Sequence, residues 1–225
     1  KDKILNEKIN GCVFLNKNKT ALVESYAPRI QLLDTIPSPY TTGILDEFFD
    51  GKLIPVIQTT RGCPFSCTFC VEGDSYYNTI SHSSSDKLAS EFNYIGEKMA
   101  TIRKDGGRND LFIADSNFGM YKTDLTTAKL ISNVKKRYDW PDYINVATGK
   151  NHKERVLEVS NIIDGSLRLS GSVQSLNPTV LENIKRKNIS ASDLMELSLS
   201  ASQINANSYS EIILGLPGET KESHY

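Results

Sequence analysis

Three closely spaced cysteines are the strongest chemical signal in the sequence. Cys63, Cys67 and Cys70 lie in the stretch Thr-Arg-Gly-Cys-Pro-Phe-Ser-Cys-Thr-Phe-Cys, which begins at Thr60. Spacings of three and then two residues allow one tight loop to direct three thiolates toward a common centre. Thiolates are soft ligands that suit zinc or an iron–sulfur cluster. On a four-iron cluster, three thiolates leave one iron open, and an open iron can bind a substrate or a cofactor.

Other roles for these cysteines are weaker. A closed structural zinc site usually has four ligands, so His82, His152 or His224 would have to complete it. Electron transfer of the ferredoxin type normally uses four cysteines per cluster, and a loop containing glycine and proline is a poor place to bury free cysteines. Cys12 has no partner nearby in sequence and is expected to be a small core residue. The alternative to an enzyme is a non-catalytic zinc- or cluster-binding interaction module.

Composition narrows the class of protein. The 225 residues are 39% hydrophobic and 24% charged, with a net charge of -1, which argues against non-specific nucleic-acid binding. No apolar run is long enough to cross a bilayer, and Lys1–Lys8 shows no secretory signal. Cysteines grouped for a metal site favour a reducing compartment, so we expect a cytoplasmic protein without a membrane partner. Because Lys1 is not methionine and Tyr225 stops where a helix should begin, we expect a longer protein.

A repeating order of strand, loop and helix begins at residue 53. We expect strands at 53–59, 111–114, 143–147, 167–170 and 209–214, and helices at 83–102, 123–137, 152–163, 179–186 and 192–204. Successive strand–helix units imply parallel strands with right-handed crossovers. A doubly wound sheet and a barrel both satisfy this pattern. In either fold, the chemistry should lie at the carboxyl ends of the strands.

Local signals mark some of these boundaries. Ser83 with Asp86 could cap the first helix, whose apolar residues line one face: Leu88, Phe92, Ile95, Met99 and Ile102. Asn177 and Pro178 supply an N-cap and a first-turn proline for the fourth helix. Residues 1–50 are expected to form a lead-in with strand pieces at 11–15 and 20–23, followed by a Pro-Ser-Pro-Tyr connector.

The cysteine spacing, with the aromatic Phe69 just before the last cysteine, resembles the signature of the radical S-adenosylmethionine (SAM) superfamily. The resemblance implies a [4Fe-4S] cluster on Cys63, Cys67 and Cys70, with SAM chelating the open iron. One electron would then cleave SAM and release a 5′-deoxyadenosyl radical, while Phe69 would lie beside the adenine. The implied fold is α/β, a parallel partial (β/α)6 barrel like that of triosephosphate isomerase. It would occupy residues 51–225 and stop after about five strands.

A segment after the fourth strand supports this resemblance. The stretch Val173–Leu181, with Arg186 beyond it, resembles the fourth-strand segment of coproporphyrinogen-oxidase-like members. By that resemblance, Gln174, Ser175 and Arg186 contact SAM, and a guanidinium fork suits its carboxylate. The alternative for Arg186 is a solvated helix end.

A second supporting segment, Glu211–Thr220, resembles the fifth strand, which passes the adenine in the superfamily. Its implied cofactor contacts are Glu211, near the nucleoside, together with Ile213 and Gly215. An apolar core would explain Ile212 and Leu214 without any cofactor.

The segment after the second strand departs from the common pattern. Many members carry a Gly-Gly-Glu type segment there, whereas this chain reads Ala-Asp-Ser-Asn-Phe-Gly from Ala114. This form and the Pro-Ser-Pro-Tyr connector resemble the branch that often carries an N-terminal cobalamin-binding domain. By this resemblance Asp115 or Asn117 faces the cofactor or the substrate; the alternative is that both cap the turn.

The reaction itself is not specified by these residues. No Asp-x-His-x-x-Gly cobalamin motif is present, so a cobalamin domain would lie outside this sequence or be absent. The resemblance leaves open hydrogen abstraction, sulfur transfer, cyclisation or cobalamin-linked methyl transfer on an unknown substrate. A flavodoxin- or ferredoxin-like electron donor is the expected protein partner.

Overall fold

The computed structural model describes residues 8–25, 28–149, 151–188, 190–203 and 208–225. The chain divides into two compact units, Lys1–Gln31 and Leu32–Tyr225, while the predicted domain boundary after residue 50 stays a prediction. In the first unit, β1 (Val13–Leu15) and β2 (Leu22–Glu24) pair as an antiparallel hairpin. Cys12 is exposed beside this hairpin, so its expected place in a core is wrong.

Five parallel strands organise the second unit. Strands β3 (Val56–Ile57), β6 (Asp110–Ile113) and β7 (Tyr143–Asn145) form one parallel sheet in that order, and β8 (Leu169–Ser170) pairs in parallel with β9 (Ser208–Tyr209). A parallel bridge between Ile144 and Leu167 continues the first sheet toward β8. Four of the five strands are shorter than predicted, and β6 has the predicted length but begins one residue earlier. Their order and parallel pairing agree with the α/β prediction.

The helices follow the predicted order, with different ends. They are α1 (Ser85–Lys104), α2 (Thr123–Tyr138), α3 (Lys153–Ile162), α4 (Pro178–Asn183), α5 (Ala191–Gln203) and α6 (Lys221–His224). The predicted cap at Ser83 is wrong, because the Ser84 side chain accepts the Lys87 N–H at 3.2 Å. Asn177 caps α4 as predicted, but α4 ends before Arg186. Ile204, the predicted end of the fifth helix, lies outside the described residues.

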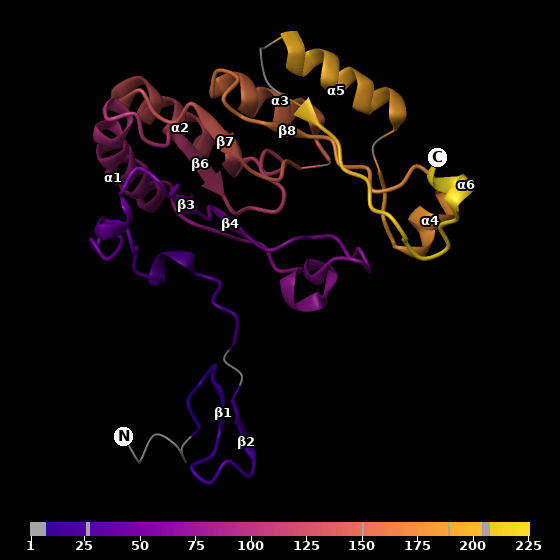
Figure 1. The fold of residues 1–225 in the computed structure, drawn as a ribbon, viewed down its shortest axis with the longest axis horizontal. Helices are drawn as coiled ribbons and strands as arrows, with labels where there is room; N and C mark the ends of the chain where they lie inside the picture. Colours follow the sequence, from indigo (N-terminus) through magenta and orange to yellow (C-terminus); the bar gives the residue numbers. More distant parts are fainter. Residues whose placement is uncertain (1–7, 26–27, 150, 189, 204–207) are drawn as a thin grey trace. The chain divides into compact units, whose positions relative to one another are not determined.

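One face of the three-stranded sheet carries the main core. Side chains alternate between the two faces of a strand, and Leu111, Ile113 and Ile144 are fully buried in one cluster with residues of α1, α2 and α3. These three helices follow the strands along one side in Figure 1. On the other face, Val56 and its register partner Phe112 are exposed. The helices therefore cover one side of the sheet and leave the other open.

A small antiparallel pair was missed by the sequence analysis. Strand β4 (Thr60–Arg61) pairs with β5 (Ser81–His82) immediately before and after the cysteine segment. Two-residue strands are too short to show a hydrophobic period. This pair closes the neck of a loop that spans residues 62–80, which we call the cysteine loop.

Helix α1 depends on the packing of Phe92, which is fully buried in the main core. We expect Phe92→Ala to lower the free energy of unfolding by about 3–5 kcal/mol, because it removes buried apolar surface and leaves a cavity. Ser90→Ala, on the exposed side of the same helix, should change it by less than about 0.5 kcal/mol. Chemical denaturation followed by circular dichroism measures both. Equal effects of the two substitutions would contradict the assigned core.

Candidate functional site

Backbone hydrogen bonds fix the cysteine loop at several points. The Cys63 N–H donates to the Tyr77 carbonyl at 2.9 Å, and the Cys70 N–H donates to the Cys67 carbonyl at 3.2 Å. The Thr68 N–H donates to the Ile184 carbonyl at 3.1 Å, which ties the loop to the end of α4. The loop is therefore attached to the segment that follows the fourth parallel strand.

Gly73 packs against the backbone of the central cysteine. A Cβ added at Gly73 would lie 2.1 Å from the Cys67 carbonyl oxygen and 3.0 Å from the Cys67 nitrogen. Backbone atoms cannot move aside like the end of a flexible side chain, so glycine is required at this position. This close approach sets the path of the chain just after the third cysteine.

All three cysteine sulfurs lie within electrostatic range of one buried cation, Arg186. Burial lowers the pKa of this guanidinium, while a hydrogen bond with Cys67 and the charges of Cys67, Cys70 and Cys63 raise it. Arg186 is only 6% exposed, so the solvated alternative predicted for it is wrong. Its remaining partners are the Ser172 carbonyl, 2.5 Å from Nη2, and the Asn188 Oδ1 atom, 2.8 Å from Nε. The guanidinium also lies 5.9 Å from the ring centroid of Phe69.

The three thiols suit a multi-iron cluster by the chemistry of their sulfur ligands. Within the described residues, no group of three Cys, His, Asp or Glu side chains is arranged around a single metal ion. Thiolates that bind different irons of one cluster lie farther apart than ligands of one ion. Cys67 is buried, Cys63 is half-buried and Cys70 is exposed, so the group faces the protein on one side and solvent on the other. Soft thiolates beside a fixed cation suit an iron–sulfur centre.

Asp115 holds the neck of the cysteine loop to the end of β6. Its carboxylate accepts the Thr59 N–H at 2.8 Å, the Thr59 hydroxyl at 2.5 Å and the Thr60 N–H at 3.1 Å. Burial raises the pKa of Asp115 to about 7, against the lowering effect of these hydrogen bonds. Asp115 thus bonds across to the neighbouring strand end and does not cap its own turn.

Asn117 reaches the cysteine loop directly. Its side-chain amide donates to the Cys63 sulfur at 3.3 Å, and the residue is 3% exposed. Tyr121 lies in the same region, where burial first and then the Cys63 charge raise the pKa of its phenol to about 12. Its hydroxyl oxygen is buried without a hydrogen-bond partner among the described residues. Sequence reasoning missed Tyr121, because no local motif marks it.

Gln174 lies in a sharp turn that the neighbouring Asn188 side chain fixes. Gln174 has a positive φ of 58°, an uncommon conformation for a residue other than glycine, and it is buried. The Asn188 amide donates to the carbonyls of Val173 and Ser175 at 2.6 and 2.7 Å, on either side of Gln174. The Gln174 Oε1 atom is buried and unpaired within the described part of the chain. It is therefore an acceptor available to a bound molecule.

Only part of the fifth-strand segment, Glu211–Thr220, approaches the Gln174 turn. The Glu211 carboxylate accepts from the Ser172 hydroxyl at 2.6 Å. Ile213 packs against a small apolar cluster of Val180, Ile184 and Leu216. Gly215 is exposed, and its N–H donates to the Glu219 carboxylate at 2.6 Å. Ile212 and Leu214 are 60% and 75% exposed, so the apolar core expected around them is wrong.

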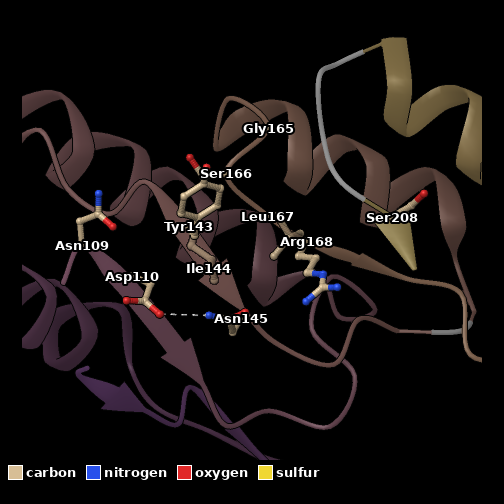
Figure 2. Close-up of a pocket in the computed structure, with 10 residues that line it drawn as sticks. All are labelled: Asn109, Asp110, Tyr143, Ile144, Asn145, Gly165, Ser166, Leu167, Arg168 and Ser208. Atoms are coloured by element: carbon tan, nitrogen blue, oxygen red, sulfur yellow. Dashed lines mark hydrogen bonds between the residues drawn. The ribbon is translucent and has the colours of Figure 1, made fainter. Parts of the chain in front are cut away.

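A separate cavity lies at the opposite ends of the strands. It measures about 500 Å³ and is lined by residues that include Asp110 and Tyr143, the first residues of β6 and β7 (Figure 2). Arg168 and Asn145 point toward the same space, with the Asn145 amide 3.5 Å from Asp110. None of the predicted site residues lines this cavity. The candidate site is therefore at the cysteine loop, beyond the carboxyl ends of the strands.

Comparison with known protein families identifies the fold and the chemistry. Residues 57–224 match the radical SAM superfamily, which is most of the chain. The chain belongs to the radical SAM superfamily. Members of this superfamily are enzymes that use a [4Fe-4S] cluster and SAM, so this chain is a piece of an enzyme core and not of a non-catalytic module. None of the described helices is long and apolar enough to span a membrane.

Two curated relatives are similar to this chain over most of its length. It is 32% identical over 220 residues to the cobalamin-dependent radical SAM methyltransferase TokK of Streptomyces tokunonensis, covering 94% of this chain and 31% of TokK. It is also 32% identical over 196 residues to the 2-(S-pantetheinyl)-carbapenam-3-carboxylate methyltransferase of Streptantibioticus cattleyicolor, covering 83% of this chain and 28% of that protein. The chain thus spans about a third of the length of these relatives.

The structural comparison agrees on the fold. The cobalamin-dependent SAM radical enzyme OxsB, with aqua-cobalamin bound, superposes with a TM-score of 0.64 at 16% identity, covering 92% of this chain and 30% of OxsB. At this identity the likeness concerns the fold alone. It supports an α/β radical SAM fold for the described chain.

The packing of Gly73 gives a test of the cysteine loop. In the intact protein, we expect Gly73→Ala to reduce the iron bound after anaerobic reconstitution, because the new methyl group displaces the Cys67 backbone. Val71→Ala is the matched control, since the Val71 side chain is 74% exposed in the same short turn. Iron and sulfide analysis measures the effect. Normal iron binding by Gly73→Ala would contradict the close packing described above.

Proposed function

We propose that Cys63, Cys67 and Cys70 hold a [4Fe-4S] cluster and that the adjoining pocket binds SAM. The observation that carries this proposal is the buried guanidinium of Arg186, which hydrogen-bonds Cys67 and lies within electrostatic range of Cys63 and Cys70. A bound cluster would supply the electron that cleaves SAM to methionine and a 5′-deoxyadenosyl radical. The protein's part is to hold the thiolates, orient SAM and limit access of water and oxygen.

Two of the predicted contacts to SAM, Gln174 and Phe69, offer an unpaired acceptor and a partly exposed aromatic ring. Arg186 already donates to Asn188 through Nε and to Ser172 through Nη2, and the N–H groups left at the end of its guanidinium suit a carboxylate. Phe69 offers an aromatic face beside Arg186. The other proposed contacts in this pocket come from the strand ends and their loops: Asn117, Ser175, Glu211, Ile213 and Gly215.

Asp115 takes a different role in this proposal. Its oxygens already accept hydrogen bonds from Thr59 and Thr60 at the neck of the cysteine loop. We therefore assign it to positioning the loop, with no direct contact to SAM required. The short hydrogen bonds between the two strand ends support this assignment.

We further propose that the whole protein is a cobalamin-dependent methyltransferase whose core is the partial (β/α)6 barrel at residues 51–225. The names of the two relatives with 32% identity support methyl transfer, and TokK is named as cobalamin-dependent. Cobalamin would bind through a domain outside this chain, and a flavodoxin- or ferredoxin-like protein would supply electrons in the cytoplasm. The methyl acceptor is left open.

The cluster assignment predicts a specific loss in cysteine variants. In the intact protein, Cys67→Ala should abolish both cluster binding and formation of 5′-deoxyadenosine, because it removes one of three ligands. Cys12→Ala is the matched control, since Cys12 is an exposed free cysteine in the other unit. Visible absorbance, iron analysis and chromatography of the products measure these effects. Cleavage of SAM by Cys67→Ala would refute the ligand assignment.

The contacts of Asn188 predict a role in SAM binding. Asn188→Ala removes two donors from the Gln174 turn and one acceptor from Arg186. At about 1 kcal/mol for a typical hydrogen bond and more for a charged one, we expect roughly tenfold weaker binding or worse. Calorimetric titration of the reconstituted protein with SAM measures the affinity.

Two further variants make this test specific. Asn188→Asp keeps the acceptor for Arg186 but places a carboxylate oxygen against the Val173 and Ser175 carbonyls, so its affinity should fall at least as far as that of Asn188→Ala. Asn161→Ala, at an exposed position in α3, should bind SAM normally. Unchanged affinity in Asn188→Ala would show that the turn does not depend on this side chain.

A further inference from the structure

The hydrogen bond between Asn117 and Cys63 connects the loop after β6 to one of the three cysteines. The donor is the Asn117 side-chain nitrogen, 3.3 Å from the sulfur. A thiolate is an acceptor, so the amide must present its N–H and not its oxygen. Hydrogen bonds to an ionised acceptor are stronger than those between neutral groups. The contact therefore suits a Cys63 sulfur that serves as a ligand of the cluster.

The backbone around Asn117 holds this donor in place. The Asn117 carbonyl accepts the Met120 N–H at 3.1 Å, and the next N–H, from Phe118, donates to the Ala147 carbonyl at 3.0 Å. Phe118 is 1% exposed within the main core. On the other side, the Cys63 N–H is bonded to Tyr77. Because both partners are anchored and Asn117 is buried, the contact is a fixed part of the site.

We propose that Asn117 sets the reduction potential of the cluster by donating a hydrogen bond to the Cys63 thiolate. This inference rests on the proposed function, because it requires a cluster at Cys63, Cys67 and Cys70. Reduction adds one electron to the cluster, and the N–H dipole stabilises the more negative reduced form more than the oxidised form. Asn117 thereby raises the midpoint potential and makes the cluster easier to reduce.

This role is compatible with a contact between Asn117 and SAM. A side-chain amide carries two N–H donors and one acceptor oxygen, and the bond to Cys63 uses only one of the donors. The same side chain can thus contact the cluster through one N–H and a bound cofactor through its remaining groups. Asn117 is a positioning and tuning residue in this proposal, and it takes no proton or electron itself.

The test is the midpoint potential of the reconstituted intact protein, measured by redox titration with electron paramagnetic resonance. Asn117→Leu preserves the branched shape and excludes water, whereas Asn117→Ala makes room for water; both remove the donor. We expect the midpoint potential to become more negative in both variants. Asn93→Leu, a half-buried asparagine on α1, should keep the wild-type potential. Unchanged potentials, or shifts of opposite sign in the two Asn117 variants, would overturn the proposal.

A measurement on the unsubstituted protein keeps the test decisive if both variants lose the cluster. With asparagine labelled with nitrogen-15 at the side-chain amide, pulsed resonance of the reduced cluster should show a nitrogen-15 coupling. Absence of this coupling would overturn the role of Asn117 even where SAM is cleaved normally. A wild-type protein that forms no cluster at all would instead overturn the proposed function, so the two failures are distinguishable.

Discussion

The buried guanidinium of Arg186 is the constraint around which the site is arranged. Burying a charge is costly unless it is paired and hydrogen-bonded. Arg186 meets this requirement with the Ser172 carbonyl, the Asn188 oxygen and the nearby cysteine sulfurs. The cysteine loop, the Gln174 turn and the segment after α4 must therefore all be correctly placed around Arg186, because its charge is buried. A single buried charge thus links the cysteine loop to two segments that are far from it in sequence, the Gln174 turn and the segment after α4.

The parallel strands make this convergence possible. Their carboxyl ends lie on one edge, so the loops that leave β3, β6 and β8 come together there. Asp115 joins the first two of these loops through Thr59 and Thr60. Asn188 fixes the third loop by bonding on both sides of Gln174. The helices α1, α2 and α3 cover only one face of the three-stranded sheet, which leaves Val56 and Phe112 exposed on the other face.

Some polar side chains of the site have hydrogen-bond partners within the described residues and others have none, and this difference points to different roles. The polar side-chain atoms of Asp115 and Asn188 bond to other groups of the protein, so these two residues position the loops. Gln174 and Tyr121 each have a buried oxygen without a partner among the described residues. Buried polar groups are normally hydrogen-bonded, so these two are the places where a bound molecule would complete the structure. Under the proposed function, the molecule at Gln174 is SAM.

The sequence by itself indicated the three candidate cysteine ligands and the order of the strands and helices. The spacing of Cys63, Cys67 and Cys70 is local, and helix and strand periods are local too, so both could be read without a structure. The cap at Asn177 was also predicted, because its partner Val180 is three residues away. The two-residue pair β4–β5 was missed, since so short an element has no period.

Only the tertiary structure decided how the chemical groups meet. Asp115 binds Thr59 and Asn117 binds Cys63 across more than fifty residues of chain, and no sequence period records such a pairing. Arg186 proved to be buried, and Ile212 and Leu214 proved to be exposed. These outcomes depend on which segments pack together after folding. Residue type and spacing indicated which side chains can bind a ligand or form a hydrogen bond. Burial and long-range contacts decided which partners those side chains have.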